Sequence, residues 1–150
     1  GIGITHLIED RVVGLKVRGV YEEPAAEIII QAHKNLEKMV CTRDENDFKQ
    51  IIDNKWSYLC YEAKWLHPLI HHLNSFIDDV NKKVTGTAKI NLYKGKASVV
   101  STTSPYSLFN ENLATFMKNK AFNQNASAGF IELWNLPQKT AYNLTKELYD

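Results

Sequence analysis

The sequence predicts an α+β fold in which antiparallel strands and hairpins pack with a layer of about three main helices, followed by a C-terminal helical arm. Period-two, Ile- and Val-rich segments lie at the start of the chain and again after Lys83, and between them apolar residues recur at helical spacing. Strand and helix do not alternate regularly, as a parallel sheet would require. A length of 150 residues with 44% hydrophobic content favours one compact domain.

Residues 2–21 contain the first predicted strands. Leu15 and Val17 are apolar on either side of Lys16, and Ile and Val are frequent throughout. Pro24 then stands where a helix can begin, because a proline at the first helical position loses no intrahelical hydrogen bond. Apolar residues at helical spacing predict that this first helix runs to about Cys41.

Two more helices are predicted in the middle of the chain. Asp44 or Asn46 can cap a helix that runs to about Glu62 with one broad apolar face. A third helix follows Pro68, and its apolar stripe extends to about Val80.

The apolar period then changes from about 3.6 to two. This pattern predicts two antiparallel strands, over residues 85–93 and 96–103, around a tight turn at Lys94 and Gly95. Ser104 and Pro105 end the second strand.

The C-terminal region predicts a short helix over residues 126–136 that Pro137 interrupts. Residues 138–150 then form a polar amphipathic helix, which gains little stability alone and is expected to pack on a neighbouring chain or to fray.

Composition excludes several classes of function. A formal net charge of +1 gives no field that draws the chain to nucleic acid or anionic lipid, so neither nucleic acid nor membrane is predicted as a partner. No apolar run approaches the roughly 18 residues of a membrane span. The expected location is cytoplasmic, with Cys41 and Cys60 as reduced core cysteines.

Motifs for phosphate, cofactor and metal binding are also missing. The sequence contains neither a P-loop nor a dinucleotide-binding glycine pattern, so no cofactor site is predicted in this chain. His67 and His71 could face one metal ion on an unbroken helix, but Pro68 disfavours helical geometry at His67. We therefore predict no metal site.

An ordered series of short motifs resembles one known family over essentially all 150 residues. IEDR, VVGLKVRGVYEEPAA and QAHKNLE are followed by VTG, KG, SPYSL, NE and AGFI. This order is similar to the C-terminal synthetase and multimerisation portion of argininosuccinate synthases. The chain also opens at Gly1 directly in strand-like sequence, and we expect it to be part of a longer parent.

The resemblance implies a ligase that condenses citrulline and aspartate with ATP to give argininosuccinate, AMP and pyrophosphate. It assigns residues 1–136 to the citrulline side of the synthetase domain and residues 137–150 to an oligomerisation arm of a homotetramer. ATP, with Mg²⁺, would be a substrate bound by an N-terminal domain that this chain lacks. The fragment alone is therefore expected to be inactive and to contain no catalytic residue.

Two citrulline-binding positions of the family fall on Glu9 and Tyr21. The resemblance implies that Glu9 offers a carboxylate to the ammonium group of citrulline and that the Tyr21 hydroxyl adds a directional hydrogen bond. Without the resemblance, Glu9 would be interpreted as a solvated turn acid and Tyr21 as an amphipathic aromatic at a strand end. Asp10 and Val17 stand where the family commonly has Asn and Ser.

Binding one small ligand requires the chain to reverse between these two residues, because twelve extended residues span roughly 40 Å. A turn around Gly14, Leu15 and Lys16 would set Glu9 and Tyr21 opposite each other, which this function favours. A turn at Asp10 and Arg11 would leave them at opposite ends of the hairpin. The alternative function is a non-catalytic α+β protein-interaction module in which neither residue binds a ligand.

Overall fold

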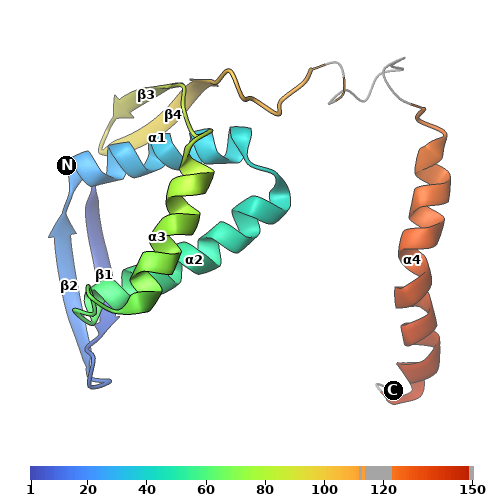
Figure 1. The fold of residues 1–150 in the computed structure, drawn as a ribbon, viewed down its shortest axis with the longest axis horizontal. Coiled ribbons are helices and arrows are strands. Elements are labelled where there is room, and N and C mark those ends of the chain that lie inside the picture. The colour runs from blue at the N-terminus through green and yellow to red at the C-terminus, as the bar shows by residue number, and fades with distance from the viewer. Residues whose placement is uncertain (112, 114–122, 149–150) are drawn as a thin grey trace. The chain divides into compact units, whose positions relative to one another are not determined.

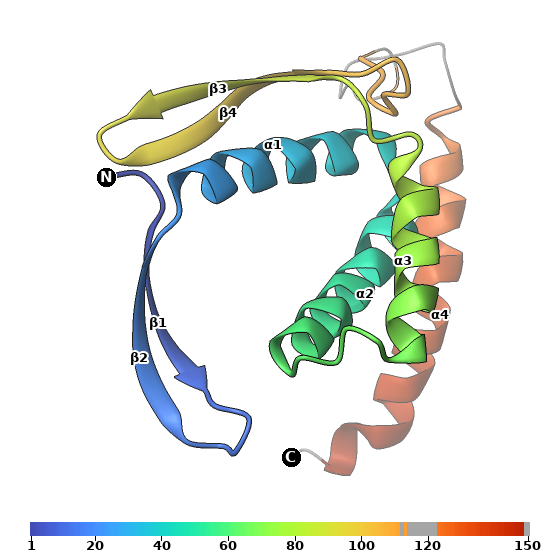
Figure 2. The same cartoon turned by 60° about the vertical axis from the view of Figure 1, so that its left-hand side comes forward.

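The computed structural model describes residues 1–111, 113 and 123–148, and its chain forms two compact units, Gly1–Leu108 and Phe109–Asp150. The first unit contains two antiparallel β-hairpins and three α-helices (Figures 1 and 2). These elements are β1 (Ile4–Asp10), β2 (Lys16–Glu22), α1 (Pro24–Val40), α2 (Arg43–Tyr61), α3 (Pro68–Asn81), β3 (Thr87–Tyr93) and β4 (Lys96–Thr103). The predicted α+β class is confirmed.

The β1–β2 hairpin reverses through a three-residue loop of Val12, Val13 and Gly14. The Arg11 amide donates to the Leu15 carbonyl at 2.8 Å, and the Gly14 amide donates to the Arg11 carbonyl at 2.7 Å. Gly14 has a φ of 85°, a left-handed conformation that favours glycine and is typical of the last residue of such a loop. With this loop, paired residues of β1 and β2 lie equally far from Val13 in the sequence.

Helix α1 begins at Pro24, as predicted, and is joined tightly to β1. The Glu23 amide donates to the Gly3 carbonyl at 2.9 Å. Gly3 has a φ of 72°, and a Cβ there would lie 2.7 Å from the Glu23 carbonyl carbon. Only glycine therefore fits this junction. The junction fixes where the first hairpin lies relative to the start of α1. The β3–β4 hairpin lies along the same helix (Figure 2).

Helix α2 is capped by Thr42, so the predicted caps at Asp44 and Asn46 are wrong. The Thr42 hydroxyl accepts from the Glu45 amide, and the Glu45 carboxylate accepts from the Thr42 amide at 2.8 Å. This reciprocal capping box satisfies two backbone donors at once, which a single Asp or Asn cap cannot do. The Asn46 side chain instead donates to the carbonyls of Cys41 and Thr42.

Helix α3 begins at Pro68, and His67 is extended with a ψ of 132°, as the rule for residues before proline predicts. The His67 Nδ1 accepts the Leu69 amide at 3.1 Å, so this ring nitrogen caps the helix. Buried side chains form two small core clusters of the first unit. One contains Val40, Cys41 and Val80, and the other contains Leu59, Ile70 and Leu73.

The β3–β4 hairpin confirms the predicted strands and turn. Lys94 and Gly95 both have positive φ, at 46° and 80°, which matches the right-handed twist of the strands they join. The register shifts between Lys89 and Ile90, where β4 contains one extra residue.

The second unit contains α4 (Ala126–Thr145) and a short 3-10 helix, η1 (Lys146–Leu148). The predicted interruption at Pro137 is wrong, because α4 runs through this proline. The φ of proline is compatible with a helix, and the residue costs one hydrogen bond rather than forcing a break. The expected helix over residues 138–150 corresponds to the second half of α4 up to Thr145, followed by η1 at Lys146–Leu148, and residues 149 and 150 lie outside the described part. The assignment of residues 137–150 to oligomerisation stays a prediction.

No helix within residues 1–111, 113 and 123–148 is long and apolar enough to cross a lipid bilayer.

Candidate functional site

Glu9 and Tyr21 lie on the same face of the first hairpin. In the antiparallel register Glu9 is opposite Val17, and Tyr21 is opposite Thr5. Side chains alternate between the two faces of a strand, so all four of these residues and Gly19 share one face. The half-buried residues of both strands lie on this face, and Tyr21 is 43% exposed at its edge.

The predicted direct pairing of Glu9 with Tyr21 is wrong. The loop at Val12–Gly14 places the two residues four positions apart along the ladder, which is about 13 Å between backbones at the usual rise of a strand. A turn at Asp10 and Arg11 is equally excluded. The expected chain reversal is present, but its centre lies two residues before the position that would set the pair opposite.

The two side chains nevertheless meet by leaning toward each other along the face. Both side chains lie against the backbone of Gly19. The Glu9 carboxylate, as a hydrogen-bond acceptor for the phenol, is the main reason that the pKa of Tyr21 is raised above its ordinary value. Burial and the charge of Glu9 act in the same direction, whereas the Arg11 guanidinium lowers the pKa.

Gly19 lies between these two side chains on β2. A Cβ at this position would lie 2.5 Å from Cε2 of Tyr21 and 2.9 Å from Oε1 of Glu9. The bare backbone of Gly19 thus leaves the space that the Tyr21 ring and the Glu9 carboxylate share. Gly19 is not among the site residues predicted from the sequence, although a glycine in a strand interior is a signal of close approach by other groups.

Tyr61, the last residue of α2, connects that helix to the same hairpin. Its hydroxyl donates to the backbone carbonyl of Asp10 at 2.8 Å, immediately after Glu9. Because the two residues are 51 positions apart and follow no local motif, sequence patterns could not indicate this contact.

This arrangement is suited to a small ligand that bears an amine. A half-buried carboxylate attracts an ammonium group, and charge-assisted hydrogen bonds are roughly twice as strong as neutral ones. The adjacent phenol can donate or accept one directional bond.

The model of the arginosuccinate synthase C-terminal domain family matches residues 1–141. The chain belongs to this family. That finding confirms the resemblance inferred from the ordered motifs.

Curated relatives agree with the family match. The argininosuccinate synthase of Staphylococcus carnosus is 46% identical over 137 residues, which cover 91% of this chain and 34% of that protein. The argininosuccinate synthase of Desulforamulus reducens is 42% identical over 147 residues, covering 98% of the chain and 37% of that protein. The chain thus spans about a third of the length of the curated relatives that it matches.

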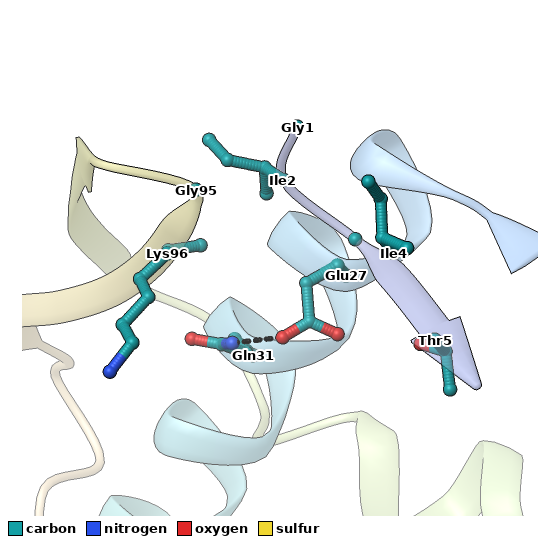
Figure 3. A pocket seen from close by; sticks show the side chains of 10 residues that line it. Gly1, Ile2, Ile4, Thr5, Glu27, Gln31, Gly95 and Lys96 are labelled. Carbon is teal, nitrogen blue, oxygen red and sulfur yellow. Dashed lines mark hydrogen bonds between the residues drawn. The ribbon is translucent and has the colours of Figure 1, made fainter. Parts of the chain in front are cut away.

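A separate cavity of about 330 Å³ lies between the start of β1, the first turns of α1 and the turn of the β3–β4 hairpin (Figure 3). Thr5 lines this cavity and pairs with Tyr21 across the first hairpin. Glu27 and Gln31 are hydrogen-bonded to each other, and the Lys96 side chain runs away from both. Polar groups that bind a ligand converge on it, whereas these do not.

Metal and thiol chemistry find no support in the described residues. No group of three or more His, Cys, Asp or Glu side chains within residues 1–111, 113 and 123–148 could hold a metal ion. Cys41 and Cys60 are free thiols that pack in or against the two core clusters, as predicted. Burial raises the pKa of the Cys41 thiol, which favours the unreactive protonated form.

Proposed function

We propose that this chain supplies citrulline-binding residues and subunit contacts to an argininosuccinate synthase. The complete protein would be an ATP-dependent carbon–nitrogen ligase that joins citrulline to aspartate and releases AMP and pyrophosphate. ATP with Mg²⁺, and most of the aspartate contacts, would belong to an N-terminal ATP-binding domain outside this chain. The fragment by itself would be inactive.

The observation that carries this proposal is the convergence of Glu9 and Tyr21 on one face of the first hairpin. The Glu9 carboxylate would bind the citrulline ammonium group through a charge-assisted hydrogen bond. The Tyr21 hydroxyl beside it would make a directional bond to the same ligand. Tyr61 supports this geometry, because its bond to the Asp10 carbonyl ties the end of β1 to α2.

Subunit contacts are assigned to α4 in the second unit. Large apolar side chains are at least half exposed along this helix, namely Phe130, Ile131, Leu133, Trp134, Leu136, Tyr142 and Leu144. None of its residues is buried within the chain. An exposed apolar surface of this kind marks an interaction site, and we assign it to the interfaces of a homotetramer.

Isothermal titration calorimetry of the full-length protein with citrulline tests the binding site. Glu9→Gln keeps the size of the side chain but removes its charge, and Tyr21→Phe removes only the hydroxyl. We expect both variants to weaken citrulline binding at least tenfold, with Glu9→Gln the weaker binder, because loss of a charged partner costs more than loss of a neutral one.

Unchanged citrulline affinity in both variants would contradict the proposed site. It would favour the alternative of a non-catalytic α+β protein-interaction module in which neither residue meets a ligand. The absence of an ATP-binding domain in the full-length protein would likewise contradict ligase activity.

A further inference from the structure

We propose that Gly19 is a positioning residue that sets citrulline affinity through the space it leaves between Glu9 and Tyr21. This inference rests on the proposed function, because it treats the Glu9–Tyr21 pair as the ligand site. Gly19 itself offers no side chain to bind anything. Its contribution is the absence of a Cβ at the one place where the carboxylate and the phenol ring approach each other.

The distances locate the constraint in side chains rather than in the backbone. The nearest atoms to an added Cβ are Cε2 of Tyr21 at 2.5 Å, Oε1 of Glu9 at 2.9 Å and Cζ of Tyr21 at 3.0 Å. Real Cβ contacts essentially never fall below 3.0 Å, so the Tyr21 ring, the Glu9 carboxylate or both must move. Either movement takes the carboxylate or the phenol away from the position in which both can reach one ligand.

Other glycines of the same unit are constrained differently. At Gly3 and Gly86 an added Cβ would meet backbone atoms, and both residues have positive φ. Gly19 does not have a positive φ, and the first groups that a Cβ would meet are the ends of two movable side chains. Gly19→Ala should therefore leave the hairpin folded while it separates the pair.

The effect expected of Gly19→Ala on the stability of the strand is opposite to its expected effect on citrulline binding. Glycine in a strand interior weakens the strand, because it has no side chain to pack and loses more conformational freedom on folding. If Gly19 were only a strand residue, alanine would be neutral or stabilising and would leave ligand binding unchanged. A positioning role instead predicts that Gly19→Ala weakens citrulline binding while the protein stays folded.

The test compares Gly19→Ala with Val20→Ala in the full-length protein. Val20 is the next residue of β2, points to the opposite face and is 55% exposed, so its truncation disturbs the same strand without touching the pair. Calorimetry with citrulline should show at least tenfold weaker binding for Gly19→Ala and less than a twofold change for Val20→Ala. In steady-state assays the KM for citrulline should rise, whereas the KM values for ATP and aspartate should not.

A second measurement follows the pair without any ligand. The absorbance change on ionisation of Tyr21, isolated by subtracting the titration of Tyr21→Phe, should occur at lower pH in Gly19→Ala than in the parent protein, because the nearby Glu9 carboxylate raises the pKa of Tyr21.

The outcomes separate this inference from the proposed function. Citrulline affinity within twofold of the parent, or an unfolded Gly19→Ala variant by circular dichroism, overturns the role of Gly19. If Glu9→Gln and Tyr21→Phe weaken citrulline binding while Gly19→Ala does not, only the inference fails. If none of the three changes citrulline affinity, the proposed site fails with it.

Discussion

Lys49 carries a buried positive charge and links α2 to α1 through an ion pair with Glu37. Its side chain is 7% exposed, and its ammonium group lies 2.7 Å from a Glu37 carboxylate oxygen and 2.8 Å from an Asp53 oxygen. Burial alone would lower the pKa of Lys49, but the hydrogen bonds to Asp53 and Glu37 outweigh it and raise the pKa. The cation is therefore stabilised by its two partners.

Lys49→Met should destabilise the chain by about 3 kcal/mol. Methionine fills a similar volume, so the loss comes from the charges rather than from a cavity. Glu37 is only 11% exposed and would keep a single partner, His33 at 3.1 Å, and removing one partner of a buried ion pair typically costs 3–5 kcal/mol. Asp53 is 42% exposed and would be hydrated instead, which places the expected loss at the lower end.

Urea unfolding of the chain, followed by the fluorescence of Trp56 and Trp65, measures this loss. The control is Lys49→Met combined with Glu37→Gln, which also removes the buried anion and should recover more than half of the stability. A loss below about 1 kcal/mol for Lys49→Met, or no recovery in the double variant, would refute the reasoning that the uncompensated Glu37 carboxylate causes the effect.

Three further predictions follow from the structure. A hydrogen bond from Lys83, together with those from Thr42, lowers the pKa of Glu45 to about 2. The lowered pKa contributes stability above the ordinary carboxyl range, and this contribution is lost as pH falls from about 4.5 toward 2. Because the side chain is 35% exposed, Glu45→Gln should remove only about 1 kcal/mol at pH 7 and flatten this part of an acid-unfolding curve; an unaltered curve would contradict the assignment. Glu9→Gln should shift the ionisation of Tyr21 to lower pH in a spectrophotometric titration, because the Glu9 carboxylate raises the pKa of Tyr21, and an unmoved midpoint would contradict this interaction. Trp134→Ala should lower the assembly state measured by light scattering, because Trp134 stacks on Phe130 on the exposed surface of α4; retention of a full tetramer would argue against an interface there.

Local sequence signals predicted the secondary structure where a few adjacent residues decide the conformation. Pro24 and Pro68 begin helices because each lacks only a donor that the first turn leaves unused. Gly95 adopts its positive φ without steric cost, and a tight two-residue turn of this hand also places Lys94 at positive φ. The capping box at Thr42 and Glu45 was also readable from sequence, although Asp44 and Asn46 offered competing caps.

The tertiary structure decided the geometry of the candidate site. Glu9 and Tyr21 could be named from the ordered motifs, but their register depended on which of several residues closed the first loop, and a one-residue change would have moved one of them to the other face. The space at Gly19 exists only once that register is fixed.

The sequence by itself determined the α+β class, the family and the positions of most turns, because periodicity, proline and glycine act within a few residues of the chain. Only the tertiary structure decided that Tyr61 bonds the strand beside Glu9 and that Lys49 is buried between two carboxylates. The physical reason is that burial and long-range hydrogen bonds depend on segments far apart in sequence. Their free energies exceed the local propensities that sequence patterns report.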